Sequence, residues 1–232
     1  MHTRSVTAPD HRFFLLMSAV AFAVVLAGFA PTYYLKPLFG TPALKPFVHV
    51  HAAAFTAWCV LLIVQPLLIR RGNLQVHRRL GVLGGGIAAV VVTTGYLVIF
   101  GKPRPTEFMK AFILMPMMSL LLFTLFVAAA VWYRRDAPMH KRLMYLSLLF
   151  IVGAGMSRTL RMLGVDSQPH LSHVVTACLL LIPLIVYDLI RVRKLHRATA
   201  WGIAASIVVH PVYAVFAHTS QWQRIAAWLT NS

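Results

Sequence analysis

The residues of this chain that could do chemistry are histidines and arginines set in or beside long apolar segments. His51 and His173 lie near the beginnings of two such segments, Arg158 and Arg161 near the end of a third, and His210 inside a fourth. Ionisable side chains are costly to bury among apolar residues, so a functional role is the default expectation for them. Imidazoles are axial ligands of haem iron, and guanidinium groups bind carboxylates such as the haem propionates. These five residues are therefore candidates for a haem site or a polar ligand site.

A second set of histidines lies at short polar turns between apolar segments. His77, His140 and His196 each stand beside Arg or Lys and open the segment that follows the turn. If the three hairpins pack around a common axis, three neutral imidazoles with a carboxylate behind them would suit zinc or copper. The flanking cations oppose the approach of a divalent metal, and binding of anionic lipid accounts for them without any site. The three-histidine metal site is therefore the lesser hypothesis.

Two further polar residues, Gln65 and Asp188, belong to the layer of the turn histidines. Gln65 precedes Pro66 near the end of the second apolar segment, and Asp188 lies near the end of the sixth. The chain has only five acidic residues, so acid–base chemistry would have to rest on histidine. For Asp188 we expect an ion pair with Arg191 or with a cation of one of the turns.

The composition assigns these apolar segments to a membrane. Of the 232 residues, 59% are hydrophobic and 12% are charged, whereas about 25% is the usual charged share of soluble domains. The net charge of +17 would suit nucleic acid in a soluble protein, but here the cations are confined to short stretches between apolar runs. We therefore expect membrane lipids, including anionic headgroups, as partners, and no nucleic acid. A membrane partner subunit is a further candidate.

The apolar runs predict an all-α polytopic membrane helix bundle of about seven transmembrane helices. A helix needs roughly 20 apolar residues to cross the hydrocarbon core. By this rule we expect spans over Phe13–Pro31, Phe47–Ile69, Leu80–Phe100, Phe108–Tyr133, Leu143–Leu163, Leu171–Ile190 and Thr199–Ala217. The connections are short, so residues 1–232 are expected to form a single membrane domain.

The distribution of Lys and Arg predicts the orientation of the bundle. With the N-terminus in the cytoplasm, the three basic turns lie inside and the outer loops keep few cations, as the positive-inside rule requires. The chain is therefore expected to be N-in and C-out, with residues 1–12 as a short cytoplasmic tail. The stretch that follows His11 and Arg12 also resembles a signal peptide, but Pro31 disfavours cleavage, so we expect the first helix to be retained.

Depth along the spans separates the candidate residues into layers. At about 1.5 Å of rise per residue, His51, Arg161 and His173 lie roughly 27–28 Å from the basic residues that anchor their own helices. Arg158 lies a turn deeper, and His210 roughly 20 Å from its anchor. One interpretation is a b-type haem between His51 and His173, with the arginines on its propionates. Interfacial anchoring of these side chains, or a polar ligand pocket, is the other interpretation.

Other motifs exclude several kinds of site. Cys59 and Cys178 lie inside apolar segments without Cys-x-x-Cys spacing, so we expect small buried residues. No Gly-Lys-Ser/Thr follows Gly84-Gly85-Gly86, and close helix packing is the expectation there. The chain has no nucleophile elbow, no His-Glu-x-x-His motif and no pair of carboxylates within a span. Enzymatic activity is left open.

The histidine motifs also carry a resemblance. The motifs are His49-x-His51 with Phe55-Thr56-Ala57-Trp58 and Gln65, His77-Arg78-Arg79-Leu80-Gly81, His140-Lys141-Arg142-Leu143-Met144, and Tyr187-Asp188 with His196. In this pattern the chain resembles bacterial multi-pass inner-membrane proteins of a family defined only as a domain of unknown function. The second turn also resembles small membrane proteins linked to cytochrome oxidase assembly. The resemblance implies the topology and a bacterial inner membrane, and it implies no established reaction.

Three hypotheses of function follow from the sequence. The first is a haem- or metal-binding membrane protein with a redox or respiratory-assembly role, favoured by the 11 histidines and their matched depths. The second is a transporter or a binder of a lipophilic small molecule, in which Arg158, Arg161 and His210 line a polar cavity. The third is a non-catalytic accessory subunit, in which the polar residues anchor helices and bind lipid or a partner.

Overall fold

The computed structural model describes residues 8–101, 106–165 and 169–230, and these residues form helices joined by short turns. The helices are α1 (Ala8–Phe29), the π-helical turn η1 (Ala30–Tyr34), α2 (Lys36–Phe39), α3 (Pro46–Arg70), α4 (Leu74–Phe100), α5 (Glu107–Trp132), α6 (Ala137–Ile151), α7 (Gly153–Met162), α8 (Pro169–Arg191), α9 (Arg197–Phe216) and α10 (Ser220–Thr230). The described residues contain no strand. The all-α class expected from the apolar runs is thus confirmed.

By length and composition, six segments of the described chain can cross a membrane, or seven when a bent helix pair is counted as one span, in agreement with the prediction of about seven spans. Six are single helices of sufficient length and hydropathy, and the seventh is the pair α6 and α7, bent by 43°. The predicted fifth span, Leu143–Leu163, corresponds to this bent pair. The chain is therefore a polytopic membrane helix bundle.

The break between α6 and α7 follows from the local sequence. Gly153 and Gly155 lower the helical preference at this point, and the carbonyl of Val152 accepts from both Gly155 N (2.9 Å) and Met156 N (3.1 Å). The imidazole of His173 lies so close to Gly153 that a Cβ there would stand 2.7 Å from its Cε1. The bend thus combines two glycines with a side chain wedged against the first of them, which are ordinary causes of a kink.

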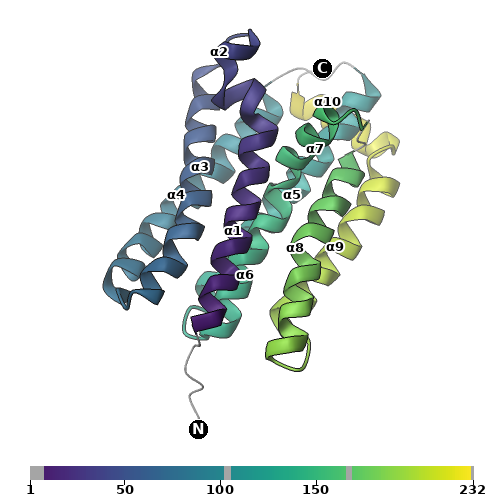
Figure 1. The fold of residues 1–232 in the computed structure, drawn as a ribbon. Helices are drawn as coiled ribbons and strands as arrows, with labels where there is room; N and C mark the ends of the chain where they lie inside the picture. Colours follow the sequence, from purple (N-terminus) through teal and green to yellow (C-terminus); the bar gives the residue numbers. More distant parts are fainter. Residues whose placement is uncertain (1–7, 102–105, 166–168, 231–232) are drawn as a thin grey trace.

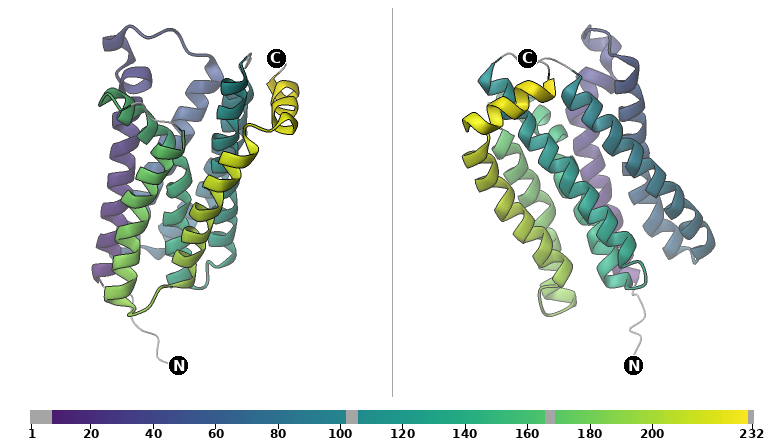
Figure 2. Two further views of the ribbon diagram at one scale, coloured as in Figure 1. Left: turned by 90° about the vertical axis from the view of Figure 1, so that its right-hand side faces the viewer. Right: turned by 180° about the vertical axis from the view of Figure 1, so that it is seen from behind.

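Three helical hairpins and α1 make up the bundle (Figure 1). The hairpins are α3–α4, α5–α6 and α8–α9, and α1 packs against α3, α7 and α6. The α3–α4 hairpin diverges from α5 and α6 toward its turn, as the front and rear views both show (Figures 1 and 2). The short helix α10, which the sequence analysis did not predict, lies across the end of the bundle against α5 (Figure 2).

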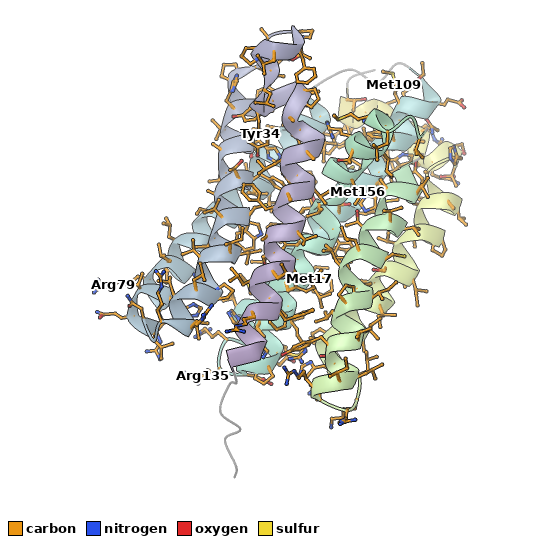
Figure 3. All side chains as sticks on the ribbon, in the orientation of Figure 1. Met17, Tyr34, Arg79, Met109, Arg135 and Met156 are labelled. Atoms are coloured by element: carbon orange, nitrogen blue, oxygen red, sulfur yellow. The ribbon has the colours of Figure 1, made fainter. Side chains whose placement is uncertain are left out.

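All three basic turns lie at the same end of the bundle as the beginning of α1 (Figure 1). Arg79 and Arg135 mark this end, and Tyr34 and Met109 mark the opposite one (Figure 3). We call the first the basic end and the second the far end. The prediction that the three turns lie on one side is confirmed.

Small residues set the closest helix contacts. A Cβ at Gly28 of α1 would stand 2.1 Å from the carbonyl oxygen of Gly155 in α7, and a Cβ at Gly84 would stand 2.6 Å from Leu61 of α3. Close packing at Gly84 is therefore confirmed. Gly86 has nothing within 4 Å of an added Cβ, so it does not serve this purpose. Cys178 is exposed rather than buried, which corrects the expectation for that residue, because its side of α8 does not face a neighbouring helix.

Candidate functional site

Two of the three turn histidines lie within electrostatic range of each other at the basic end. His77 lies in the first turn of α4 and His140 in the first turn of α6. Both turns are fixed by side-chain caps. Asn73 Oδ1 accepts from Val76 N (3.3 Å), and Asp136 Oδ1 accepts from Met139 N (3.1 Å). These caps determine where each helix begins and therefore where each imidazole stands.

Hydrogen bonding determines which nitrogens of the pair can bind a ligand. His140 Nδ1 lies 2.8 Å from the carbonyl oxygen of Ala130, so Nδ1 carries the hydrogen and the lone pair is on Nε2. A backbone carbonyl orients metal-binding histidines in the same way. His77 Nδ1 is buried and has no hydrogen-bond partner. Each ring thus has a nitrogen available for a ligand.

Two more buried polar atoms without a partner lie on the adjacent helix α3. They are Trp58 Nε1 and Gln65 Oε1, on residues seven apart and hence on one face of the helix. The Gln65 amide donates to the carbonyl oxygen of His77 (3.3 Å), and the Trp58 ring packs edge-on against Phe123 of α5. Buried polar groups are rarely left unpaired, so these atoms of Trp58, Gln65 and His77 need an explanation.

Glycines leave the surface of α4 without side chains on the C-terminal side of His77. Gly81 and Gly85 follow His77 at intervals of four residues and therefore share its face. A Cβ at Gly85 would meet nothing within 4 Å, and one at Gly81 would meet only Gln65 Nε2, at 3.9 Å. The helix surface beside this imidazole can therefore accept a flat group that side chains would otherwise exclude.

His196, the third turn histidine, belongs to a different cluster, centred on a buried ion pair. Asp188 Oδ1 accepts from Arg142 Nε (2.9 Å) and Nη2 (2.6 Å), and the two side chains are 0% and 2% exposed. Asp188 Oδ2 accepts from His196 N (3.1 Å) and Thr199 Oγ1 (2.5 Å). The expectation that Asp188 pairs with a turn cation is confirmed, and Arg142 is that cation. This cluster ties α6, α8 and α9 together.

The side chain of His196 caps α9 with its ring. Its Nδ1 accepts from Ala198 N (3.2 Å). Burial lowers the pKa of His196, and the charge of Arg142 lowers it further, whereas Asp188 acts in the opposite direction. The ring is therefore neutral in the folded protein near neutral pH, as its role as a hydrogen-bond acceptor requires.

The predicted three-histidine metal site is not assembled. Among the residues that the structure describes, no three or more His, Cys, Asp or Glu side chains form a group that could hold a metal ion. His77 and His140 form a pair, but His196 is held in the Asp188 cluster. The prediction placed all three at one end correctly. It missed that the α8–α9 turn packs beside α6 on the side away from α4.

The predicted outer pair, His51 and His173, lies at the far end but in two separate helix interfaces. His51 Nδ1 is 3.0 Å from Thr94 Oγ1 of α4. His173 packs on Gly153 and borders a small cavity of about 10 Å³ together with Leu149 and Ser206, among others. Helix α3 packs mainly on α4 and α1, whereas α8 packs on α7, α9 and α6. The structure therefore does not bring these two imidazoles to one site.

The two arginines of the outer layer have separate environments. Arg158 Nη1 donates to the carbonyl oxygen of Ala154 (2.9 Å), and its guanidinium lies 4.2 Å from the centroid of the Phe29 ring. Arg161 is exposed near the end of α7. These placements fit interfacial anchoring better than contact with a shared ligand. His210 lies on α9, and its side chain is outside the described residues.

Sequence reasoning missed several polar residues of these sites. Trp58 and Arg142 appeared only inside motifs, Thr199 only as the start of an expected span, and Thr94 not at all. The signal available for Arg142 was its place one turn inside α6, where it must be buried and needs a carboxylate. Comparison of the chain with protein-family models, with curated proteins and with solved structures gives no match.

Proposed function

We propose that the protein is a membrane haem protein that binds one b-type haem between His77 and His140 and passes single electrons. The observation that carries the proposal is the pair itself. Two imidazoles from different helices are within electrostatic range of each other, one is oriented by a backbone carbonyl, and the other has a buried nitrogen without a partner. Axial ligation by two imidazoles is a common arrangement for haem in helix bundles.

The charge at the basic end supports a haem better than a bare metal ion. Arg78 lies within electrostatic range of His77, and Lys141 follows His140. Cations repel a divalent ion, but a haem carries two propionates, which Arg and Lys bind through charge-assisted hydrogen bonds. The same residues that oppose zinc or copper at these turns therefore favour a haem.

The shape of the interface supports a planar ligand. Gly81 and Gly85 leave the α4 surface beside His77 without side chains. The α3–α4 hairpin diverges from the α5–α6 hairpin toward the basic end (Figures 1 and 2). A macrocycle between the two rings would lie against the glycine surface, with Trp58 Nε1 and Gln65 Oε1 as polar neighbours.

If His77 and His140 both held the haem, it would supply electron transfer rather than binding of oxygen. This chemistry fits a redox or respiratory-assembly role in a bacterial inner membrane. The resemblance of the second turn to proteins linked to cytochrome oxidase assembly favours the same role. The alternatives, a transporter or an accessory subunit without a cofactor, gain support only if no haem is bound.

The test is the absorbance spectrum of the protein purified from a haem-replete bacterial host. We expect a Soret band in the oxidised protein and a sharpened α band after reduction with dithionite. Loss of an axial ligand should cost more than the roughly 10- to 100-fold in affinity that loss of an outer-shell partner costs. His77→Ala and His140→Ala should therefore each lower the haem content at least about tenfold, while His196→Ala keeps it.

A matched pair of glycine variants tests the location of the macrocycle. Gly85→Leu fills the proposed haem surface, whereas Gly86→Leu places the same side chain where an added Cβ also meets nothing. We expect Gly85→Leu alone to lower the haem content. A spectrum without a Soret band, or one that His51→Ala or His173→Ala abolishes while His77→Ala leaves it intact, contradicts the assignment.

A further inference from the structure

A second binding feature lies away from the histidine pair, between α1 and α8 at the basic end. It is a groove of about 420 Å³ lined by Phe13, Pro183, Val186, Tyr187, Ile190 and Arg191. This volume is within the range of about 300–1,000 Å³ that is usual for small-molecule sites. The groove is not used by the proposed haem.

The groove exists because α1 and α8 touch only through a few large side chains. Helix α1 packs on α3, α7 and α6, and it meets α8 where the ring of Phe13 stacks on Tyr187 with 4.3 Å between centroids. Tyr187 is in turn held by the guanidinium of Arg142, 5.6 Å from its ring centroid. Arg142 is itself paired with Asp188, so this wall of the groove is connected to the buried ion pair.

Apolar side chains line most of the groove, and one cationic side chain borders it. Val186 and Ile190 are 47% and 63% exposed, although both lie within the candidate span Leu171–Arg191. Arg191 borders the groove, and Arg12 immediately precedes Phe13. The carboxylate nearest in sequence, that of Asp188, is fully buried in its ion pair and cannot neutralise them.

These features together define the chemistry of an occupant. Within a membrane, apolar side chains that no helix covers are covered by hydrocarbon chains, and cations at the boundary attract anionic headgroups. We infer that the groove binds one anionic phospholipid, with an acyl chain along Val186 and Ile190 and its phosphate at Arg191. This inference does not depend on the haem.

The test is native mass spectrometry of the full chain in mild detergent, with phosphatidylglycerol or phosphatidylcholine added at equal concentration. One Lys or Arg near an anionic surface contributes about 1 kcal/mol, which corresponds to about fivefold in affinity. We therefore expect one phosphatidylglycerol per chain to be retained at about fivefold higher affinity than phosphatidylcholine. Arg191→Ala should remove most of this preference.

Two matched controls separate the groove from general lipid attraction. Val186→Trp fills the groove, whereas Leu189→Trp places the same bulk on an exposed position of α8 that does not line it. Arg193→Ala removes a basic residue that lies just beyond α8, outside the groove. Retention should fall only in Val186→Trp and Arg191→Ala. Equal retention of the two lipids, or full retention by Val186→Trp, overturns the inference, whatever the haem content of the samples.

Discussion

Asp188 shows at the scale of single residues how a charge can be buried in this bundle. Its carboxylate accepts two hydrogen bonds from Arg142, one from Thr199 and one from the backbone of His196. A buried ion pair contributes little net stability unless its remaining lone pairs are satisfied, as they are here. Removal of one partner leaves an uncompensated charge, so the pair acts chiefly by specifying how α6, α8 and α9 fit together.

His196 should make the stability of the protein depend on pH. Burial and Arg142 lower its pKa below the usual value of 6.5, so the unfolded chain binds more protons as the pH falls through about 6.5. Protonation of Nδ1 would also remove the acceptor for Ala198 N. We expect thermal unfolding of the wild type at a lower temperature at about pH 5.5 than at about pH 7.5.

The matched variant for this prediction is His196→Asn, because asparagine keeps a helix-capping acceptor and does not titrate. Its midpoint temperature should depend less on pH than that of the wild type over the same interval. An equal dependence in the two proteins would contradict the assignment of the effect to His196. Differential scanning fluorimetry in one detergent measures both.

At the scale of elements, the bent pair α6–α7 and the glycine contact of α1 with α7 belong together. The bend carries α7 toward α1 at the far end, where Gly28 and Gly155 let the backbones meet. Continuous hydropathy over residues 143–163 predicted one span, because hydropathy reports the apolar length of a segment and not a bend in its helix axis. Only the Gly153-Ala154-Gly155 triplet signalled a break, and a similar glycine triplet in α4 leaves that helix unbroken.

Gly28→Ala should weaken the packing of α1. The new Cβ would stand 2.1 Å from the carbonyl oxygen of Gly155, so the two helices must separate. Overpacking of this kind costs about 1–3 kcal/mol, and the midpoint temperature should fall. The control Gly86→Ala meets nothing within 4 Å and should leave stability equal or slightly higher. Equal stability of the two variants would show that α1 and α7 are not in contact here.

At the scale of the whole molecule, the sequence predicted the membrane spans and the end at which the basic turns lie, but it did not predict which helices are neighbours. Apolar length gave seven spans, and the basic turns were placed at one end, as found. Depth along each helix grouped His77 with His140 and His196, and His51 with His173. Which residues at equal depth are neighbours depends on helix packing, which short loops do not determine. His77 and His140 are within electrostatic range of each other, whereas His196 is held by Asp188, and His51 and His173 lie in separate helix interfaces.

The orientation across the membrane remains a prediction from the positive-inside rule. Reporter fusions test it in a bacterial host. Alkaline phosphatase fused after Ser232 should be active, because the C-terminus is expected outside, and the same enzyme fused after Gly72 or Arg135 should be inactive. Green fluorescent protein at these positions should show the reverse pattern. The opposite result at all positions would invert the bundle and move the proposed lipid site to the outer leaflet.

The cations concentrated at one end of the bundle are not balanced by acidic residues of the chain. The chain carries 22 Lys and Arg against 5 acidic residues, and one of those acids is enclosed with Arg142. The turns of the three hairpins therefore repel one another when nothing outside balances them. We expect an anionic leaflet to supply this balance in a membrane. In a neutral detergent, only dissolved salt can screen the repulsion between the turns. Added salt should therefore stabilise the packing of the hairpins in detergent rather than weaken it.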